Sequence, residues 1–210
     1  MTELEKYVAE HTSPESALLK ELDRETNLRM VQPRMISGHV QGRLLKMIVQ
    51  MVQPRYVLEI GTFTGYSALC MAEGLADVAE LHTIEIDDEL EGLARSFFAR
   101  SEYSERIFLH IGSALKIAPE LSKKFDLIFI DGDKREYPAY YRMAMEHLVH
   151  SGSYIIADNI LWYGKVTGET PANDLFSKGI KEFNDMVSAD DRVENVILPV
   201  RDGLNLIRVK

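Results

Sequence analysis

The sequence predicts an α/β protein with a mostly parallel sheet, extra helices before it and an antiparallel hairpin after it. Residues 1–53 show helical periodicity. From residue 56, short apolar runs of strand length alternate with runs of helix length, a pattern typical of a right-handed parallel sheet. Near the end, two strand-like runs flank a turn glycine, which indicates a hairpin. With 210 residues, 46% of them hydrophobic, the chain suits one domain spanning residues 1–210.

The N-terminal helical segment, residues 1–53, is predicted to pack on the α/β core. Ser13-Pro14-Glu15-Ser16 predicts a helix start with Pro14 in the first turn. An apolar stripe at helical spacing follows and ends before Pro54, formed by Leu44, Leu45, Ile48 and Val52.

The remaining elements follow in order along the chain. Parallel strands are expected at residues 56–59, 80–85, 107–110, 126–131 and 153–158. Helices are expected between them at 66–76, 87–101 and 137–150, and a further helix at 173–187. The hairpin pairs residues 193–200 with 204–209 around Arg201-Asp202-Gly203, which gives a seven-stranded sheet.

Composition excludes several function classes. The formal net charge of −9 disfavours a nucleic-acid-binding surface. No apolar run is long enough to span a membrane, and residues 1–12 are polar and charged, so no signal peptide is expected. Cys70 is the only cysteine and fits a buried position in a reducing cytoplasm.

Two predicted strands end in oxygen-bearing side chains. The run FDLIFIDGDK stops at Asp131, and SYIIADN stops at Asp158–Asn159. Because ligands bind at the carboxyl ends of strands in open α/β sheets, these side chains should meet around one point. Carboxylate and amide oxygens suit Mg²⁺ or Ca²⁺. Asp131 could instead cap a helix, but that interpretation leaves the repeated pattern at Asp158–Asn159 unexplained.

Lys134 lies three residues beyond Asp131, close enough to act on a group that the cation holds. The alternative is a solvated turn lysine paired with Glu136. Trp162 follows the second acidic strand end in a loop. A lone tryptophan is usually part of a core, whereas a loop aromatic beside a metal suits the wall of an aromatic substrate site.

A glycine-rich turn follows the first strand in VLEIGTFTGYS. Gly61 and Gly65 allow close backbone approach to a ligand. The spacing matches neither GxGxxG nor GxxxxGK[ST], which disfavours a dinucleotide site and a phosphate cradle. Glu85 ends the second strand, where a carboxylate can accept hydrogen bonds from ribose hydroxyls. A glycine turn beside a solvated glutamate remains the alternative for this pair alone.

In this order, EIGTFTGYS, TIEID, FIDGDKREYPAYY, ADNILWYGKV and LPVRDGLNLI resemble the cation-dependent class I methyltransferases of the catechol and caffeoyl-CoA O-methyltransferase type. The resemblance covers about residues 30 to 210 and implies a Rossmann-like class I methyltransferase fold that binds S-adenosylmethionine. Gly132-Asp133 is the plant and bacterial form of the motif. A segment for recognising CoA is not evident in residues 1–12, which disfavours a CoA ester.

The resemblance also implies roles for individual residues. The divalent cation, Mg²⁺ or else Ca²⁺ or Mn²⁺, would be held by Asp131, Asp158 and Asn159. Lys134 and Asp131 would be catalytic, and the substrate would contact Lys134, Tyr140, Asn159 and Trp162. Cofactor contacts would fall on Met35, Ser37, Glu59, Gly61, Tyr66, Ser67, Glu85, Ala114, Asp131 and Asp133.

The expected function is therefore transfer of a methyl group to one hydroxyl of a small catechol-type vicinal diol. A cation that binds both oxygens would lower the pKa of the hydroxyl, and Lys134 would accept the proton. Two alternatives stay open: a tRNA hydroxyuridine O-methyltransferase of the same family, and a cofactor-binding scaffold without activity. The resemblance also implies a homodimer.

Overall fold

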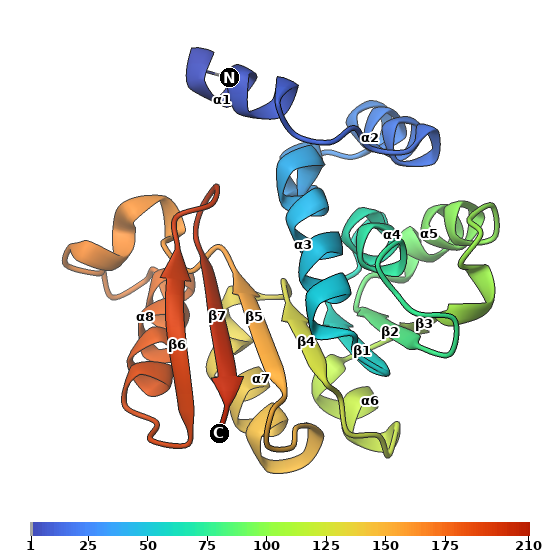
Figure 1. Ribbon diagram of the computed structural model, residues 1–210. Helices are drawn as coiled ribbons and strands as arrows, with labels where there is room; N and C mark the ends of the chain where they lie inside the picture. The colour runs from blue at the N-terminus through green and yellow to red at the C-terminus, as the bar shows by residue number, and fades with distance from the viewer. Residues whose placement is uncertain (1) are drawn as a thin grey trace.

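The computed structural model describes residues 2–210 and contains one seven-stranded sheet (Figure 1). The strand order is β3-β2-β1-β4-β5-β7-β6; the first five strands are parallel, and β7 is antiparallel to both β5 and β6. The strands are β1 (Tyr56–Ile60), β2 (Glu80–Glu85), β3 (Ile107–Ile111), β4 (Leu127–Ile130), β5 (Tyr154–Asp158), β6 (Val193–Leu198) and β7 (Leu204–Val209). The predicted mixed sheet with a terminal hairpin is confirmed.

The N-terminal segment forms α1 (Glu3–Glu10), α2 (Ala17–Arg29), the short 3-10 turn η1 (Pro33–Met35) and α3 (Gly38–Val52). The start of α2 differs from the prediction. Ser16 caps the helix by accepting a hydrogen bond from the Leu19 amide at 3.3 Å, so Pro14 lies before the helix and not in its first turn. The predicted helix end before Pro54 is confirmed, since α3 stops at Val52.

Helices cover both faces of the parallel part of the sheet (Figure 1). They are α4 (Tyr66–Ala72), α5 (Glu91–Phe98), α6 (Ala114–Glu120), α7 (Tyr137–Met143) with a π-helical turn at Ala144–Leu148, and α8 (Leu175–Ser188). The short helix α6 was not among the expected elements. Short 3-10 turns lie at Asp88–Leu90, Ser104–Arg106, Lys134–Glu136 and Trp162–Thr167.

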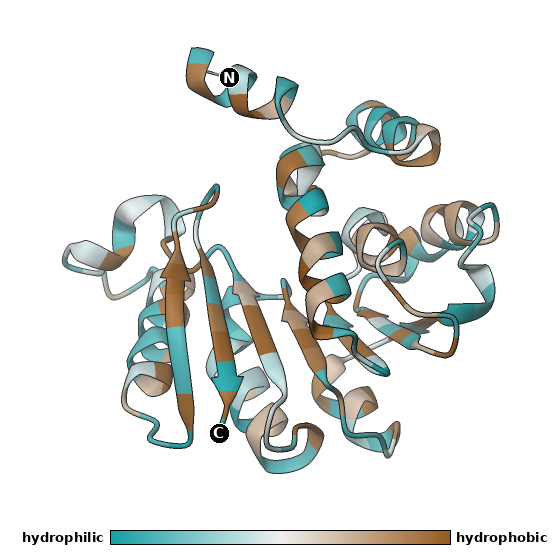
Figure 2. Ribbon diagram, viewed as in Figure 1, coloured by the Kyte–Doolittle hydropathy of each residue, from teal (hydrophilic) through white to brown (hydrophobic). Residues whose placement is uncertain are grey.

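Two apolar clusters form, one on each face of the sheet. In β4, Leu127 and Phe129 face the cluster beneath α3 and α4, whereas Ile128 and Ile130 face the cluster beneath α7 and α8. A strand buried on both faces needs a continuous apolar run, because successive side chains point to opposite faces. Figure 2 shows the apolar residues concentrated on these strands. From residue 2 onward, no helix is both long and apolar enough to cross a membrane.

The strand order reverses between β1 and β4, and in open α/β sheets ligands bind at the carboxyl ends of the strands at such a switch point. Gly61 follows β1 with a φ angle of +101°, and a Cβ atom there would lie 2.5 Å from the Asp131 carbonyl oxygen. Only glycine lets the two strand ends approach this closely. The fold thus brings the predicted glycine turn next to the first predicted acidic strand end.

Candidate active site

Asp158 is the buried acid of the site, with 3% of its surface exposed at the end of β5. Its carboxylate accepts hydrogen bonds from Gln41 Nε2 and from the Asn159 backbone amide, both at 2.6 Å. Burial raises the pKa of Asp158 to about 6, and the nearby charge of Asp131 adds to this effect. The two strand-end acids therefore influence one another, as their positions in the sequence predicted.

Lys134 is buried and held by two groups of the site. Its Nζ donates to Asp131 Oδ1 at 2.7 Å and to the Tyr137 hydroxyl at 2.9 Å. The Tyr137 hydroxyl lies within hydrogen-bonding distance of the Asp158 carbonyl, at 2.9 Å, so it links the ends of both strands. Burial raises the pKa of Tyr137 well above its usual value, and the phenol stays neutral. The alternative of a solvated lysine paired with Glu136 is wrong.

Asp131 is not a helix cap either. The residue that caps the following turn is Asp133, which accepts a hydrogen bond from the Arg135 backbone amide at 2.9 Å. Asp131 is left with its contact to Lys134 and its position beside Asp158. A carboxylate that is not used for capping is available for a ligand.

The donor atoms at the strand ends suit a hard divalent cation. Within residues 2–210, no cluster of three or more His, Cys, Asp and Glu residues is arranged to hold a metal. A cation here could be held by the carboxylates of Asp131 and Asp158 together with the amide oxygen of Asn159. Asn159 has a left-handed backbone, with a φ angle of 57°, where the chain turns out of β5. Two carboxylates and one amide oxygen form a ligand set typical of Mg²⁺ or Ca²⁺.

Beside the glycine turn, Glu59 is fully buried near the end of β1. It accepts hydrogen bonds from the hydroxyls of Ser67 and Thr83, both at 2.5 Å. Burial raises the pKa of Glu59 to about 8, although both hydroxyls act in the opposite direction. The predicted residues Glu59 and Ser67 are thus in direct contact across the glycine turn.

Glu85 ends β2 beside the same turn and is 7% exposed. Its carboxylate accepts hydrogen bonds from the backbone amides of Phe63, at 2.7 Å, and Asp87, at 3.0 Å. Burial raises the pKa of Glu85. The solvated-glutamate alternative is therefore wrong, because this carboxylate is fixed in the turn. Carboxylate oxygens have further lone pairs that can accept hydrogen bonds from a ligand.

The other predicted cofactor residues occupy varied environments. Met35 ends η1 and is 56% exposed, whereas Ser37 and Ala114 are buried at the starts of α3 and α6. Asp133 forms an ion pair with Arg135. Tyr66 belongs to the apolar core, and its hydroxyl donates to Glu15 at 2.8 Å. That hydroxyl is directed at the N-terminal segment.

The two predicted substrate aromatics are placed differently. Tyr140 is buried on α7, with its hydroxyl donating to Glu136 at 2.6 Å. Trp162 is half-buried in the loop after β5, with a positive φ angle of 46°, and its ring stacks on Phe176 of α8 with centroids 5.9 Å apart. Tyr140 thus lies in the helix that follows β4, and Trp162 lies in the loop that follows β5 with part of its surface exposed.

Gln41 and Tyr137 were not predicted from the sequence. Gln41 is fully buried in α3, and its Oε1 has no hydrogen-bond partner among residues 2–210. Gln41 lies four residues before Leu45 and seven before Ile48, on the same side of the helix as these apolar residues. A polar residue in that position is a sequence feature that could have indicated its role. Tyr137, three residues beyond Lys134, offered no comparable pattern.

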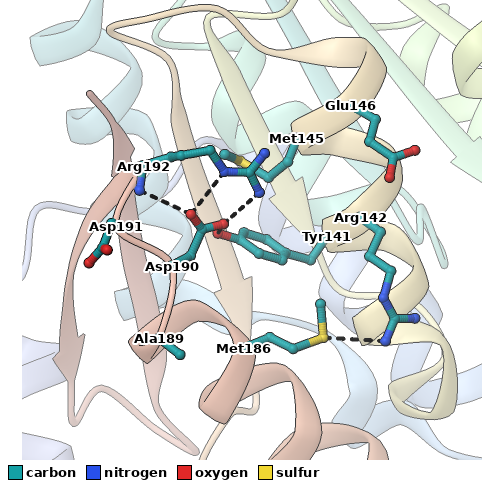
Figure 3. Close-up of a pocket in the computed structure, with 9 residues that line it drawn as sticks. All are labelled: Tyr141, Arg142, Met145, Glu146, Met186, Ala189, Asp190, Asp191 and Arg192. Atoms are coloured by element: carbon teal, nitrogen blue, oxygen red, sulfur yellow. Dashed lines mark hydrogen bonds and ion pairs between the residues drawn. The ribbon is translucent and has the colours of Figure 1, made fainter.

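A separate hollow of about 390 Å³ lies between α7 and the start of β6 (Figure 3). The Tyr141 hydroxyl donates to Asp190 at 2.9 Å at its edge, and Arg192 pairs with the same carboxylate at 2.7 Å. None of the residues that line this hollow belongs to the predicted site. Asp190 and Arg192 pair with each other, and the hollow lies apart from the acids at the strand ends.

Comparison with known proteins identifies the class. A family profile described as "O-methyltransferase" matches residues 9–210. The chain belongs to this family and is an S-adenosylmethionine-dependent O-methyltransferase with a class I methyltransferase fold.

Particular relatives are similar over most of their length. The catechol O-methyltransferase of Niastella koreensis is 34% identical, with 81% of this chain and 80% of that protein covered. A probable caffeoyl-CoA O-methyltransferase of Dictyostelium discoideum is 29% identical, with 96% and 89% covered. Among solved structures, the Bacillus cereus O-methyltransferase in complex with SAH superimposes with a TM-score of 0.92 at 31% identity, covering 100% of this chain and 98% of that one.

Proposed function

We propose that this enzyme depends on a divalent cation, Mg²⁺ or else Ca²⁺ or Mn²⁺, and methylates one hydroxyl of a small aromatic vicinal diol. The observation that carries the proposal is the chain of contacts Asp131–Lys134–Tyr137–Asp158 across two strand ends. It combines hard oxygen ligands with a buried amine at adjacent strand ends. The similarity to a protein named catechol O-methyltransferase supports the same substrate class.

The cation would be held by Asp131, Asp158 and Asn159. When bound, it would supply positive charge that lowers the pKa of the acceptor hydroxyls and orients the diol. Lys134 accepts the proton of the reacting hydroxyl. The Lys134 amine can take part in three hydrogen bonds, and Asp131 and Tyr137 occupy two of these positions. The third remains for the hydroxyl of the methyl-accepting substrate.

The cofactor would lie along the ends of β1 and β2. Glu85 accepts hydrogen bonds from the ribose hydroxyls, and Gly61 allows the backbone to approach the ligand closely. The remaining cofactor contacts that we propose are Met35, Ser37, Glu59, Tyr66, Ser67, Ala114, Asp131 and Asp133. The acceptor would lie against Trp162 and Tyr140, with Asn159 and Lys134 at its hydroxyl groups.

We also propose a cytoplasmic homodimer. The first helix, α1, exposes 71% of Leu4, 59% of Tyr7 and 41% of Val8, and none of its residues is buried. A second copy would cover this apolar side. Light scattering should therefore report a dimer for the wild type and a shift toward monomer for Leu4→Glu combined with Tyr7→Glu. A double variant that remains fully dimeric would exclude α1 from the interface.

The function is tested with methyl-labelled S-adenosylmethionine, Mg²⁺, and either catechol or bulk tRNA. We expect label in catechol only, and loss of transfer after exhaustive chelation. Asp158→Asn should abolish transfer and weaken Mn²⁺ binding in calorimetry, while SAH binding stays intact. Asp191→Asn, an exposed acid outside the site, is the matched control. Full activity after chelation would refute the cation requirement, and label in tRNA would replace the substrate class.

A further inference from the structure

The turn between β6 and β7 contacts the segment that precedes α3. Arg201 in this turn donates from Nη1 to the backbone carbonyl oxygens of Ile36, at 2.9 Å, and Ser37, and its Nη2 lies 3.5 Å from the Arg34 carbonyl oxygen. These partners lie about 165 positions away in the chain. One guanidinium thus forms hydrogen bonds with three carbonyl groups of the short segment that precedes α3.

That segment lies at the site edge of the sheet. Residues 36–37 connect η1 to α3, and Gln41, in the first turns of α3, donates to Asp158 at the end of β5. Figure 1 shows the β6–β7 turn and the N-terminal end of α3 at the same edge of the sheet. Arg201 therefore fixes a segment whose neighbours reach the carboxyl ends of the strands.

The turn does not need an arginine for its own backbone. Arg201 has a φ angle of 51°, a left-handed conformation that is less favourable for a residue with a Cβ atom than for glycine. A glycine at position 201 would fit this backbone at least as well, as Gly203 does at +88°. The contribution of Arg201 must come from its side chain, whose hydrogen bonds all reach the segment before α3.

We propose that Arg201 is a positioning residue for the cofactor: it holds the carbonyl groups of Ile36 and Ser37, and so keeps Met35 and Ser37 at the S-adenosylmethionine site. The inference rests on the proposed assignment of these two residues as cofactor contacts. Arg201 is exposed to solvent, so its hydrogen bonds contribute less than buried ones would.

The variant Arg201→Gly removes the side chain and leaves a residue that suits the left-handed backbone, so the effect of the side chain can be measured by itself. Calorimetry should show a rise of roughly three- to tenfold in the dissociation constant of SAH. The melting temperature should change little, because relief of the left-handed backbone offsets the lost hydrogen bonds and the added freedom of the unfolded chain. At saturating S-adenosylmethionine, kcat and the KM for catechol should remain within about twofold of wild type, since no group at the reacting atoms has changed. Arg201→Lys should restore part of the affinity, because an ammonium can still donate to a carbonyl.

Arg208→Ala is the matched control, because Arg208 lies on β7 of the same hairpin and pairs with Glu194 at 3.0 Å. The Arg208→Ala variant should bind SAH with the same affinity as the wild type. Met35→Ala should weaken SAH binding less in the Arg201→Gly background than in the wild type, because the two act through one segment.

Two results would overturn the inference. One is an unchanged SAH dissociation constant in Arg201→Gly. The other is a lower melting temperature with equal losses in every constant, which would indicate a merely structural role. The SAH titration is run without acceptor and without cation, so a failure of the wild type to methylate catechol would refute the proposed substrate and leave this test decisive.

Discussion

Lys134 has its role set by its immediate neighbours. An ammonium group with Asp131 at 2.7 Å and the Tyr137 phenol at 2.9 Å is fixed in place, and Tyr137 in turn contacts the strand that carries Asp158. A lysine at such a position can act as a general base or as a fixed positive charge. The two roles make different predictions for arginine, which is always protonated.

Lys134→Ala should lower turnover by roughly 10²- to 10⁴-fold, the range for a lost proton-transfer group. SAH binding should largely survive, because Glu59 and Glu85 make their hydrogen bonds to groups other than this amine. The residual rate should rise with pH as the acceptor hydroxyl ionises unaided. Lys134→Arg should not rescue the rate, since guanidinium cannot accept a proton. Near-normal turnover in the arginine variant would show that the side chain acts only as a charge.

Glu85 makes the second prediction at this scale. Glu85→Ala should raise the dissociation constant of SAH roughly ten- to a hundredfold, as expected for lost hydrogen bonds to a charged acceptor. Glu85→Gln should lose less, because its amide oxygen still accepts from Phe63 or Asp87. Calorimetry measures both, with the exposed Glu89→Ala as the control. If SAH binds Glu85→Ala as tightly as it binds the wild type, the ribose does not lie at Glu85.

The sequence predicted the site residues at strand ends better than those held by distant contacts. Asp131, Asp158 and Lys134 could be located because an apolar run that stops in an acid is a local pattern, and the structure brings them together. Gln41 contacts Asp158 across 117 positions, and Arg201 contacts Ile36 across 165. Such pairs depend on the folded arrangement of elements, which periodicity does not encode.

Among the elements, the loop after β5 depends on the same turn as Arg201. Trp162 and Tyr163 both have positive φ angles, of 46° and 54°. Asp202 holds them in place: its side chain accepts from the Tyr163 amide at 2.7 Å, and its carbonyl accepts from the Leu161 amide at 3.0 Å. Residues kept in this conformation need support from their surroundings.

Asp202→Ala should therefore loosen the loop and raise the KM for catechol roughly three- to tenfold. SAH affinity should be unaffected, because the loop carries no proposed cofactor contact. Asp202→Asn should behave like the wild type, since its amide oxygen can accept from Tyr163. Steady-state kinetics at saturating S-adenosylmethionine distinguishes the three proteins. A rise in the SAH dissociation constant, with the KM for catechol unchanged, would contradict this role.

Element boundaries were predicted less well than element types. The helix α6 escaped notice because it is short and contains Pro119 near its end. The strand predicted at 126–131 spans Leu127–Ile130, and just before it the Asp126 carboxylate accepts hydrogen bonds from the backbone amides of Arg55 and Tyr56. A pattern of apolar residues does not contain such contacts, and it places the end of an element only to within a residue or two.

For the whole molecule, the mixed sheet was predictable and its strand order was not. Local patterns gave seven strands and the hairpin, since each depends on neighbouring residues. The reversal between β1 and β4 depends on which strands become neighbours. That reversal places the ends of β1 and β4 side by side at the candidate site, so the sequence indicated which acids end strands, while their arrangement required the fold.

The stability of the whole molecule should depend on pH through a histidine pair on β2 and β3. His82 Nδ1 and His110 Nε2 are 3.0 Å apart, so one nitrogen must be unprotonated to accept the hydrogen bond. His82 Nε2 lies 3.1 Å from Glu80, which also pairs with Lys123 at 2.8 Å. Burial lowers the pKa of both histidines. The positive charge of Lys123 lowers the pKa of His82 further, and the charges of His82 and Arg95 lower the pKa of His110 further.

The sign of the effect follows from proton binding. The unfolded chain takes up protons near a pKa of about 6.5, whereas the folded pair stays neutral to lower pH. The pair's contribution to the free energy of unfolding is therefore fully present above about pH 6.5 and is lost as the pH falls through the lowered pKa values.

His110→Gln keeps a side-chain amide that can donate to His82 and removes one titrating group. Urea unfolding between pH 5 and 8 should show a shallower loss of stability at acidic pH for this variant, while His147→Gln, an exposed control, follows the wild type. Parallel curves for His110→Gln and the wild type would mean that His110 contributes nothing to the pH dependence.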